Sequence, residues 1–90
     1  MTRREEILEQ AKAIISMDRN VDYGTPEENF EKIAILWGTY LGFNVYTKDV
    51  AAMMILLKVA RITTSPGVQD HWIDIAGYAA CGGEVAGPKD

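Results

Sequence analysis

Residues 25–42 read TPEENFEKIAILWGTYLG and predict a helix with both of its ends marked. Thr25 supplies an N-cap hydroxyl, Pro26 suits the first helical position, and Glu28 places a carboxylate at the third. Apolar residues then recur every three or four positions, as in a helix with one buried face. Gly42 stands where a left-handed C-cap is typical. The expected apolar stripe consists of Phe30, Ile33, Ala34, Trp37 and Leu41.

Three other helices are expected from the same two signals, a capping residue and helical periodicity. Thr2 and Glu5 form a capping box at the start of the chain, and Thr47 would cap a third helix. A Ser-Pro-Gly sequence at residues 65–67 separates this helix from a fourth. We therefore predict an all-α fold, a bundle of about four helices without a sheet. The expected bounds are residues 3–16, 26–41, 48–62 and 70–84.

The third expected helix carries an almost unbroken apolar run, VAAMMILL, at residues 50–57. A helix that is apolar nearly all round is typical of a central, buried element. Ninety residues form one domain, here residues 1–90 with a frayed tail from about residue 86, and they offer too few other side chains to cover such a helix. We therefore expect a homo-oligomer, most simply a dimer.

Composition and charge exclude several classes of protein. The net charge is −4 and the acidic residues are spread along the chain, so no basic surface predicts a nucleic-acid partner. One cysteine and one histidine make neither an intramolecular disulfide nor a zinc-ligand set, and we interpret Cys81 and His71 as structural. The start MTRREEILEQ is too polar for a signal peptide, and no apolar stretch is long enough to span a bilayer. A cytoplasmic protein without a membrane partner is expected.

The first candidate site is the segment before the second helix, which contains Arg19, Asn20, Asp22, Tyr23 and Gly24. A glycine that allows close backbone approach, followed by the amides and positive dipole end of a helix, is typical of an anion site. The alternative is a connecting turn in which the Asn and Asp side chains cap the backbone. Two glutamates already occupy the helix start, and their charge disfavours an anion there.

The second candidate is the pair Lys58 and Arg61, three residues apart on the third helix. Two cations at this spacing project together and can hold a phosphate, and arginine offers a planar fork of donors. Alternatively, the long side chains lie along apolar surface, and their charged ends reach water or pair with Asp70 and Asp74. The residue types alone leave both interpretations open.

The third candidate combines Asp70, Asp74 and Tyr78, which share one face of the fourth helix. Carboxylates four residues apart can hold Mg²⁺, or one of them can accept hydrogen bonds from a ribose or base. Two like charges at that spacing repel unless a cation offsets them, which favours a functional interpretation. The alternative is that Asp70 caps the helix and Asp74 is a surface charge. Glu27 and Glu31 form a similar pair, which is typical of a solvated helix start.

Three segments of the chain resemble a family of short phage and prophage proteins of uncharacterised function. They are RNVDYGTPEENFEKIAILWGTYLG, DVAAMMILLKVARI and DHWIDIAGYAA, and the resemblance covers about residues 19–84. It implies family membership and a location in the cytoplasm of the host cell, and it gives no activity by itself.

More loosely, the DYG loop, the Lys-x-x-Arg pair and the Asp-x-x-x-Asp-x-x-Gly-Tyr motif resemble nucleotide-modification-associated helical domains and the all-α NTP pyrophosphatases of the MazG and dimeric dUTPase type. That resemblance implies a helical oligomer that binds nucleotides between helices and holds magnesium with Glu-x-x-Glu and Glu-x-x-Asp pairs. Glu28 and Glu31 match the first spacing, whereas Asp70 and Asp74 do not match the second. A magnesium site of these four residues is therefore incomplete.

We therefore expect a binding protein rather than an enzyme. Its ligand would be a nucleotide or nucleotide-derived second messenger, with Lys58 and Arg61 on phosphate, Tyr23 or Tyr78 stacked on the base, and Asp74 on a ribose hydroxyl. By analogy with other small phage proteins, it would sequester such a signal of the host's defence. The alternatives are a magnesium-dependent NTP pyrophosphatase-like enzyme and a structural or adaptor protein without a ligand.

Overall fold

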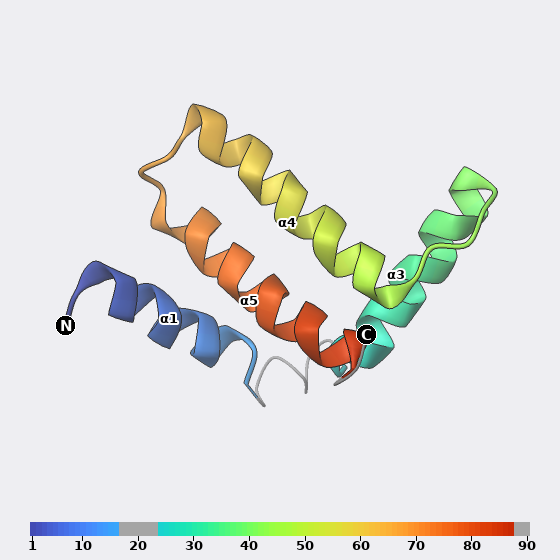
Figure 1. Ribbon diagram of the computed structural model, residues 1–90, viewed down its shortest axis with the longest axis horizontal. Helices are drawn as coiled ribbons and strands as arrows, with labels where there is room; N and C mark the ends of the chain where they lie inside the picture. The colour runs from blue at the N-terminus through green and yellow to red at the C-terminus, as the bar shows by residue number, and fades with distance from the viewer. Residues whose placement is uncertain (17–23, 88–90) are drawn as a thin grey trace.

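Helices account for all of the regular secondary structure in residues 1–16 and 24–87, which are the residues that the structure describes. The computed structural model contains α1 (Arg3–Ile14), α3 (Pro26–Leu41), α4 (Thr47–Thr64) and α5 (Gln69–Ala86) (Figure 1). No strand is present within the described ranges. For this part of the chain, the prediction of an all-α fold with four helices is confirmed.

The capping signals of α1 and α3 act as predicted. The hydroxyl of Thr2 accepts a hydrogen bond from the amide of Glu5 at 3.2 Å, and the Glu5 carboxylate accepts one from the amide of Thr2 at 2.9 Å. At the start of α3, the Thr25 hydroxyl accepts from the amide of Glu28 at 3.2 Å. Gly42 follows α3 in the left-handed region with a φ of 82°. Local chemistry therefore determines where these two helices begin and where α3 ends.

The start of α4 differs from the prediction. Tyr46, not Thr47, is the N-cap, because Tyr46 is the last extended residue before the helix. Its amide donates a hydrogen bond to the carboxylate of Asp49 at 3.0 Å, but its side chain caps no amide of the helix. Only one of the two hydrogen bonds of a capping box is therefore present. Thr47 is therefore the first residue inside the helix.

The start of α5 also differs. Val68 is the N-cap, because its carbonyl already accepts a helical hydrogen bond from the amide of His71 at 3.2 Å. The interpretation of Asp70 as the cap is therefore wrong, and Asp70 lies exposed in the first turn of α5. The remaining helix ends lie within two residues of the predicted ones, which is the usual uncertainty of a helix boundary.

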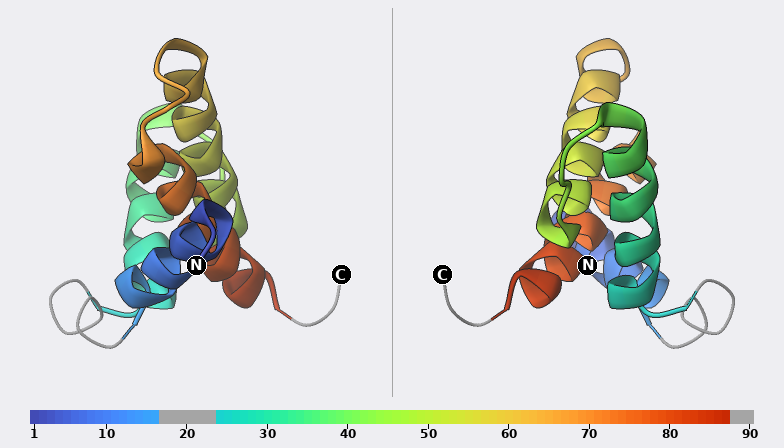
Figure 2. Two further views of the ribbon diagram at one scale, coloured as in Figure 1. Left: turned by 90° about the vertical axis from the view of Figure 1, so that its left-hand side faces the viewer. Right: turned by 90° about the vertical axis from the view of Figure 1, so that its right-hand side faces the viewer.

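The central helix is α5, and the expectation that the third predicted helix is central is wrong. α4 and α5 form a long antiparallel pair, and α1 packs on α5 (Figure 1). α3 packs across the end of this pair where α4 begins and α5 ends, so α5 contacts all three other helices (Figures 1 and 2). The apolar α4 is left at the edge of the bundle, with one side free of any described helix.

The core lies where α3, α4 and α5 meet. Phe30, Ala34, Val50 and Ala51 form one buried cluster. A Cβ on Gly82 would lie 2.8 Å from the Cβ of Ala51, so this glycine lets α4 and α5 approach each other closely. The phenylalanine and alanine belong to the apolar stripe predicted for residues 26–41, which is confirmed as the inner face of α3 in its first half.

Side-chain donors fix α1 to the link between α4 and α5. The guanidinium of Arg3 donates to the side-chain carbonyl of Gln69 at 3.0 Å and to the backbone carbonyl of Gly67 at 2.9 Å. The indole of Trp72 donates to the carbonyl of Pro66 at 2.9 Å. The two bonds of Arg3 hold the start of α1 at the start of α5, whereas the Trp72 bond fixes the link to α5. The C-terminal end of α1 lies beside the start of α3. None of the described helices is long and apolar enough to cross a membrane.

Candidate functional site

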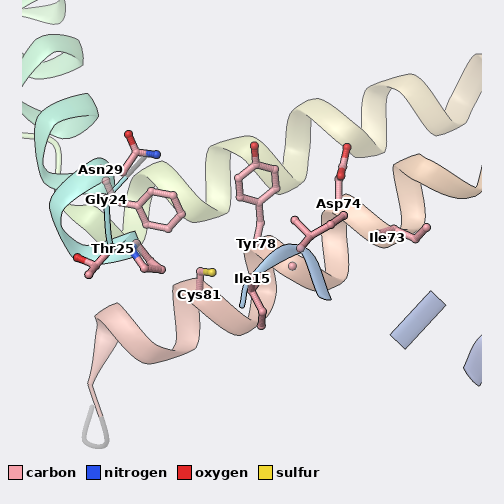
Figure 3. Close-up of a pocket in the computed structure, with 12 residues that line it drawn as sticks. Ile15, Gly24, Thr25, Asn29, Ile73, Asp74, Tyr78 and Cys81 are labelled. Atoms are coloured by element: carbon pink, nitrogen blue, oxygen red, sulfur yellow. The ribbon is translucent and has the colours of Figure 1, made fainter. Parts of the chain in front are cut away.

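A pocket of about 200 Å³ lies between the end of α1, the start of α3 and the middle of α5 (Figure 3). An engineered protein cavity of about 150 Å³ holds benzene, so the space suits one ring system of a ligand. The walls combine apolar side chains with a few polar groups, which is typical of small-molecule sites. The lining residues are Ile14, Ile15, Gly24, Thr25, Pro26, Asn29, Phe30, Ile73, Asp74, Gly77, Tyr78 and Cys81.

The contribution of α5 follows from its helical spacing. Residues three and four apart lie on one face, which brings Asp74, Tyr78 and Cys81 to the same side of the pocket. Figure 3 shows the side chains of Asp74 and Tyr78 projecting in the same direction from α5. The sequence predicted that Asp74 and Tyr78 share a face, and Gly24, which belongs to another predicted site, lines the same pocket from just before α3.

Two aromatic rings form one wall of the pocket. The ring centroids of Phe30 and Tyr78 are 6.4 Å apart, with an angle of 30° between the ring planes. Phe30 belongs to the buried core cluster and Tyr78 packs against it. The tyrosine ring is therefore held by the core, and its orientation does not depend on a ligand.

The polar edge of the pocket contains an ion pair between α4 and α5. The Lys58 ammonium lies 2.8 Å from the Asp74 carboxylate, and only 12% of the lysine side chain is exposed, against 32% for the aspartate. Loss of one partner would leave the other without its counter-charge in a poorly solvated position, which costs about 1.5–3 kcal/mol for a hydrogen bond to a charged group. Lys58 therefore holds the Asp74 carboxylate in position.

This ion pair changes the interpretation of the predicted phosphate clamp. Lys58 pairs with Asp74, which is the structural alternative for this lysine, and its charge is offset before any ligand binds. Arg61 is exposed one turn further along α4, and it has no ion-pair partner within the described ranges. The two cations therefore do not form a ready phosphate site as they stand.

The start of α3 offers few free amides to an anion. Pro26 has no amide hydrogen, and the amide of Glu28 is bonded to the Thr25 hydroxyl. A hydrogen bond from its own backbone amide is the largest cause that lowers the pKa of Glu27. The donors that would hold a phosphate in the first turn of α3 are therefore already used.

A second carboxyl group meets Glu27 near the end of α5. A hydrogen bond between Glu84 and Glu27, and then the charge of Glu27, raise the pKa of Glu84. The pKa of the Cys81 thiol is raised by burial and then by these two carboxylates. A raised thiol pKa disfavours the nucleophilic thiolate, so Cys81 is a packing residue of the pocket wall, as predicted.

The predicted site residues divide into three groups. Gly24, Asp74 and Tyr78 line the pocket, and Lys58 contacts it through Asp74. Arg61 and Asp70 are not among the lining residues. The others, Arg19, Asn20, Asp22 and Tyr23, lie outside the described residues.

Several lining residues were missed because they look like ordinary parts of helices. Asn29 and Cys81 carry polar atoms that face the pocket region, and Ile15 closes it from the end of α1 (Figure 3). Asn29 directly precedes the buried Phe30. A polar amide next to a predicted core position was the one sequence signal that could have indicated it as a pocket residue. No local pattern reveals Ile15, because its place depends on how α1 packs on α5.

The four carboxylates that the enzyme alternative requires, those of Glu28, Glu31, Asp70 and Asp74, do not gather at one site in the described part of this chain. No group of three or more His, Cys, Asp or Glu side chains that could hold a metal ion is found in residues 1–16 and 24–87. Glu28 and Glu31 are exposed on α3, and Asp74 is occupied by Lys58. A site made of these residues with Asp70 stays a prediction without support from the described geometry.

Sequence comparisons relate the chain to phage proteins. A family model described as a domain of unknown function (DUF6378) matches residues 6–86. The chain is 46% identical over 77 residues to the Gene 55 protein of Mycobacterium phage D29, and 47% identical over 85 residues to the Gene 55 protein of Mycobacterium phage L5. These matches cover 86% and 93% of this chain but 51% and 54% of the relatives, so the chain spans about half the length of the curated relatives it matches. No solved structure matches it.

Proposed function

The chain belongs to the DUF6378 family, and we propose that it binds a nucleotide or a nucleotide-derived second messenger with the base inside the pocket. The observation that carries this proposal is the Asp74 carboxylate, held by Lys58 at 2.8 Å on the edge of a ring-sized pocket with an aromatic wall. A planar heterocycle needs a surface to stack on and polar groups at its edge. Both are present in the same pocket.

The polar groups around the pocket suit a base or a ribose. The side chain of Asn29 carries both a donor and an acceptor, which matches the mixed edge of a nucleobase. Asp74 accepts hydrogen bonds, and its carboxylate has acceptor capacity beyond the one oxygen that lies 2.8 Å from Lys58. A ribose hydroxyl or an exocyclic amine would fill that capacity.

The volume places the phosphates of such a ligand outside the pocket. About 200 Å³ holds a base and leaves no room for a whole nucleotide. Arg61 lies three residues after Lys58, about 4.5 Å along the axis of α4, so a phosphate that extends past Asp74 can reach it. We therefore keep Arg61 as the phosphate-binding residue and reassign Lys58 to positioning Asp74.

We favour binding over hydrolysis, and sequestration of a host signal over metabolism. The matched relatives are phage proteins, and a small phage protein that holds a nucleotide without turning it over removes that nucleotide from solution. The pyrophosphatase alternative requires two carboxylate pairs around a metal, and within the described chain the relevant residues do not gather. The proposal includes self-association of the chain, as expected from its apolar α4.

The test is a binding screen followed by a matched pair of variants. Nucleoside mono-, di- and triphosphates, cyclic dinucleotides and ADP-ribose derivatives are added with and without magnesium, and melting temperatures are recorded. A ligand at 100 times its dissociation constant stabilises the folded protein by about 2.7 kcal/mol. Calorimetric titration then compares the wild type with Asp74→Asn and with Asp70→Asn, the same change one turn away on α5.

The proposal predicts that Asp74→Asn weakens binding by tenfold or more, about 1.4 kcal/mol or above, and that Asp70→Asn leaves it unchanged. Equal affinities in all three proteins would place the ligand elsewhere and contradict the proposed pocket. Turnover of the bound nucleotide in magnesium would support the enzyme alternative instead.

A further inference from the structure

The side of α4 that faces away from α5 is an apolar surface that the described chain does not cover. We define the α4 outer face as Ala52, Met53, Leu56, Leu57, Val59, Ala60 and Thr63, all of which are exposed. Leu56, near the middle of the face, has 64% of its surface exposed. Arg61 is the one charged residue among the exposed positions from 52 to 64, a stretch that is described in full. A solvated helix face would carry several charges.

The chain exposes more surface and is less compact than a folded monomer of its mass. The accessible surface is 6556 Å², against about 5,200 Å² for a folded monomer of this mass. The difference of about 1,300 Å² exceeds the roughly 800 Å² that each partner contributes to a standard interface. The radius of gyration is 13.9 Å, against about 12 Å for a compact domain of this length. Both values exceed those expected for a compact monomer of this mass.

We propose that the α4 outer face binds the same face of a second copy of this chain, with the two α4 helices antiparallel about a two-fold axis near Leu56. A two-fold axis requires a surface that is complementary to itself. Leu56 lies at the middle of α4, so an antiparallel copy brings Ala52 opposite Ala60 and Met53 opposite Val59. Small residues on both sides of the central leucine allow the helices to approach closely.

Charge at the two ends of the face favours a second copy in this orientation. Asp49 lies in the first turn of α4, and Arg61 lies in the last turn. At the start of α4, Asp49 pairs with Lys48 of its own chain at 3.1 Å, so that end carries no net charge, whereas Arg61 leaves the other end positive. Parallel helices would place the two positive ends together, and antiparallel helices keep them apart. The second copy thus supplies the apolar cover, and the charge of Arg61 favours the antiparallel orientation.

This inference adds a surface and an orientation to the self-association of the proposed function, and it does not depend on a ligand. The pocket lies between α1, α3 and α5, and no residue of the α4 outer face lines it. If the protein dimerises but binds no nucleotide, the proposed function fails and the proposed interface stands. If it binds a nucleotide as a monomer, the interface fails and the proposed pocket stands.

The first test compares two leucines with the same exposure. Leu56 and Leu8 have 64% and 63% of their surface exposed, and Leu8 lies on α1. Light scattering at micromolar concentration should give about 20 kDa for the wild type, twice the chain mass of 10.0 kDa. Leu56→Glu places two like charges beside the axis and should reduce the mass to that of one chain, whereas Leu8→Glu should remain dimeric. A wild-type monomer, or a wild-type oligomer that Leu56→Glu leaves intact, would overturn the proposal.

The second test measures the orientation by disulfide cross-linking, in a Cys81→Ser background that removes the one native thiol. Copies with Ala52→Cys are mixed with copies with Ala60→Cys under mild oxidation. Antiparallel helices predict a cross-linked dimer in the mixture and little in either variant alone. Cross-linking of each variant with itself but not in the mixture indicates parallel helices and overturns the proposed geometry. Absence of cross-linking in all three samples rejects the α4 interface.

Discussion

The pocket face of α5 and the outer face of α4 are both largely apolar helix surfaces, but they differ in their polar groups. On α5 the apolar residues are interrupted by Asp74 and Tyr78, and the carboxylate of Asp74 is paired with Lys58 at 2.8 Å. On the α4 outer face the exposed residues between 52 and 60 are all uncharged. A small polar ligand needs groups to orient it, whereas a second protein surface needs shape and apolar area. We therefore interpret the pocket face of α5 as the proposed ligand site and the α4 outer face as the proposed interface.

The largest expected effect tests whether the pocket wall belongs to the core. Phe30→Ala should lower the free energy of unfolding by about 3–5 kcal/mol, because it leaves a cavity in the buried cluster. Leu8→Ala, at an exposed position of α1, should change it by no more than about 0.5 kcal/mol. Urea denaturation at one fixed protein concentration measures both. A similar small effect for the two variants would show that the aromatic wall is not held by the core.

The next effect distinguishes Lys58 from Arg61. Lys58→Met should lower the free energy of unfolding by about 1.5–3 kcal/mol, since Asp74 loses the ammonium that it contacts at 2.8 Å. Arg61→Met removes an exposed charge without an ion-pair partner in the described chain and should cost no more than about 0.5 kcal/mol. The double variant Lys58→Met with Asp74→Asn should recover part of the loss. Equal costs for the two cations would rule out the positioning role of Lys58.

A smaller effect concerns the cap that holds the start of α3 at the pocket. Thr25→Ala removes the acceptor of the Glu28 amide and should cost about 1 kcal/mol. Thr47→Ala is the matched control, because Thr47 lies inside α4 and Tyr46 is the N-cap there. Thermal unfolding followed by circular dichroism compares them. If Thr47→Ala proved the more damaging change, the assigned start of α4 would be wrong.

The smallest expected effect is a pH dependence at the contact between Glu27 and Glu84. The hydrogen bond to Glu27 raises the pKa of Glu84, so its stabilising contribution is present at low pH and is lost as the pH rises through that raised pKa. Glu27 has a lowered pKa, and its contribution has the opposite sign, since it is lost as the pH falls through the lowered value. Glu84→Gln keeps a donor for Glu27 and cannot ionise.

Melting temperatures of the wild type and Glu84→Gln should therefore diverge above the usual pKa of a glutamate, with the wild type losing stability relative to the variant. Glu31→Gln, an exposed change on α3, should follow the wild type across the same range. Parallel curves for all three proteins would show that the two carboxyl groups do not share a proton.

The sequence predicted the features that depend on neighbouring residues. Thr25 and Gly42 mark the ends of α3 through local hydrogen bonds and backbone geometry, and Asp74 and Tyr78 share a face because helical spacing requires it. The resemblance to short phage proteins of uncharacterised function also agrees with the matched family model, which covers residues 6–86. These features need no knowledge of how the helices pack.

Features that depend on helix packing could not be predicted. α4 is apolar nearly all round, so its pattern does not reveal which side meets α5, and the prediction of a central position was wrong. Lys58 meets Asp74 only because of the register between α4 and α5. Ile15 and Asn29 join the pocket through the packing of α1 and α3 on α5, to which local spacing contributes nothing.

The most direct test of the proposed pocket is amide NMR of the ¹⁵N-labelled protein titrated with the same nucleotide panel. At least one ligand should shift the amide signals of Asn29, Asp74, Tyr78 and Cys81, while the signals of Met53 and Leu56 on the α4 outer face stay in place. Shifts confined to α4, or no shift at millimolar concentration of any nucleotide, would contradict it.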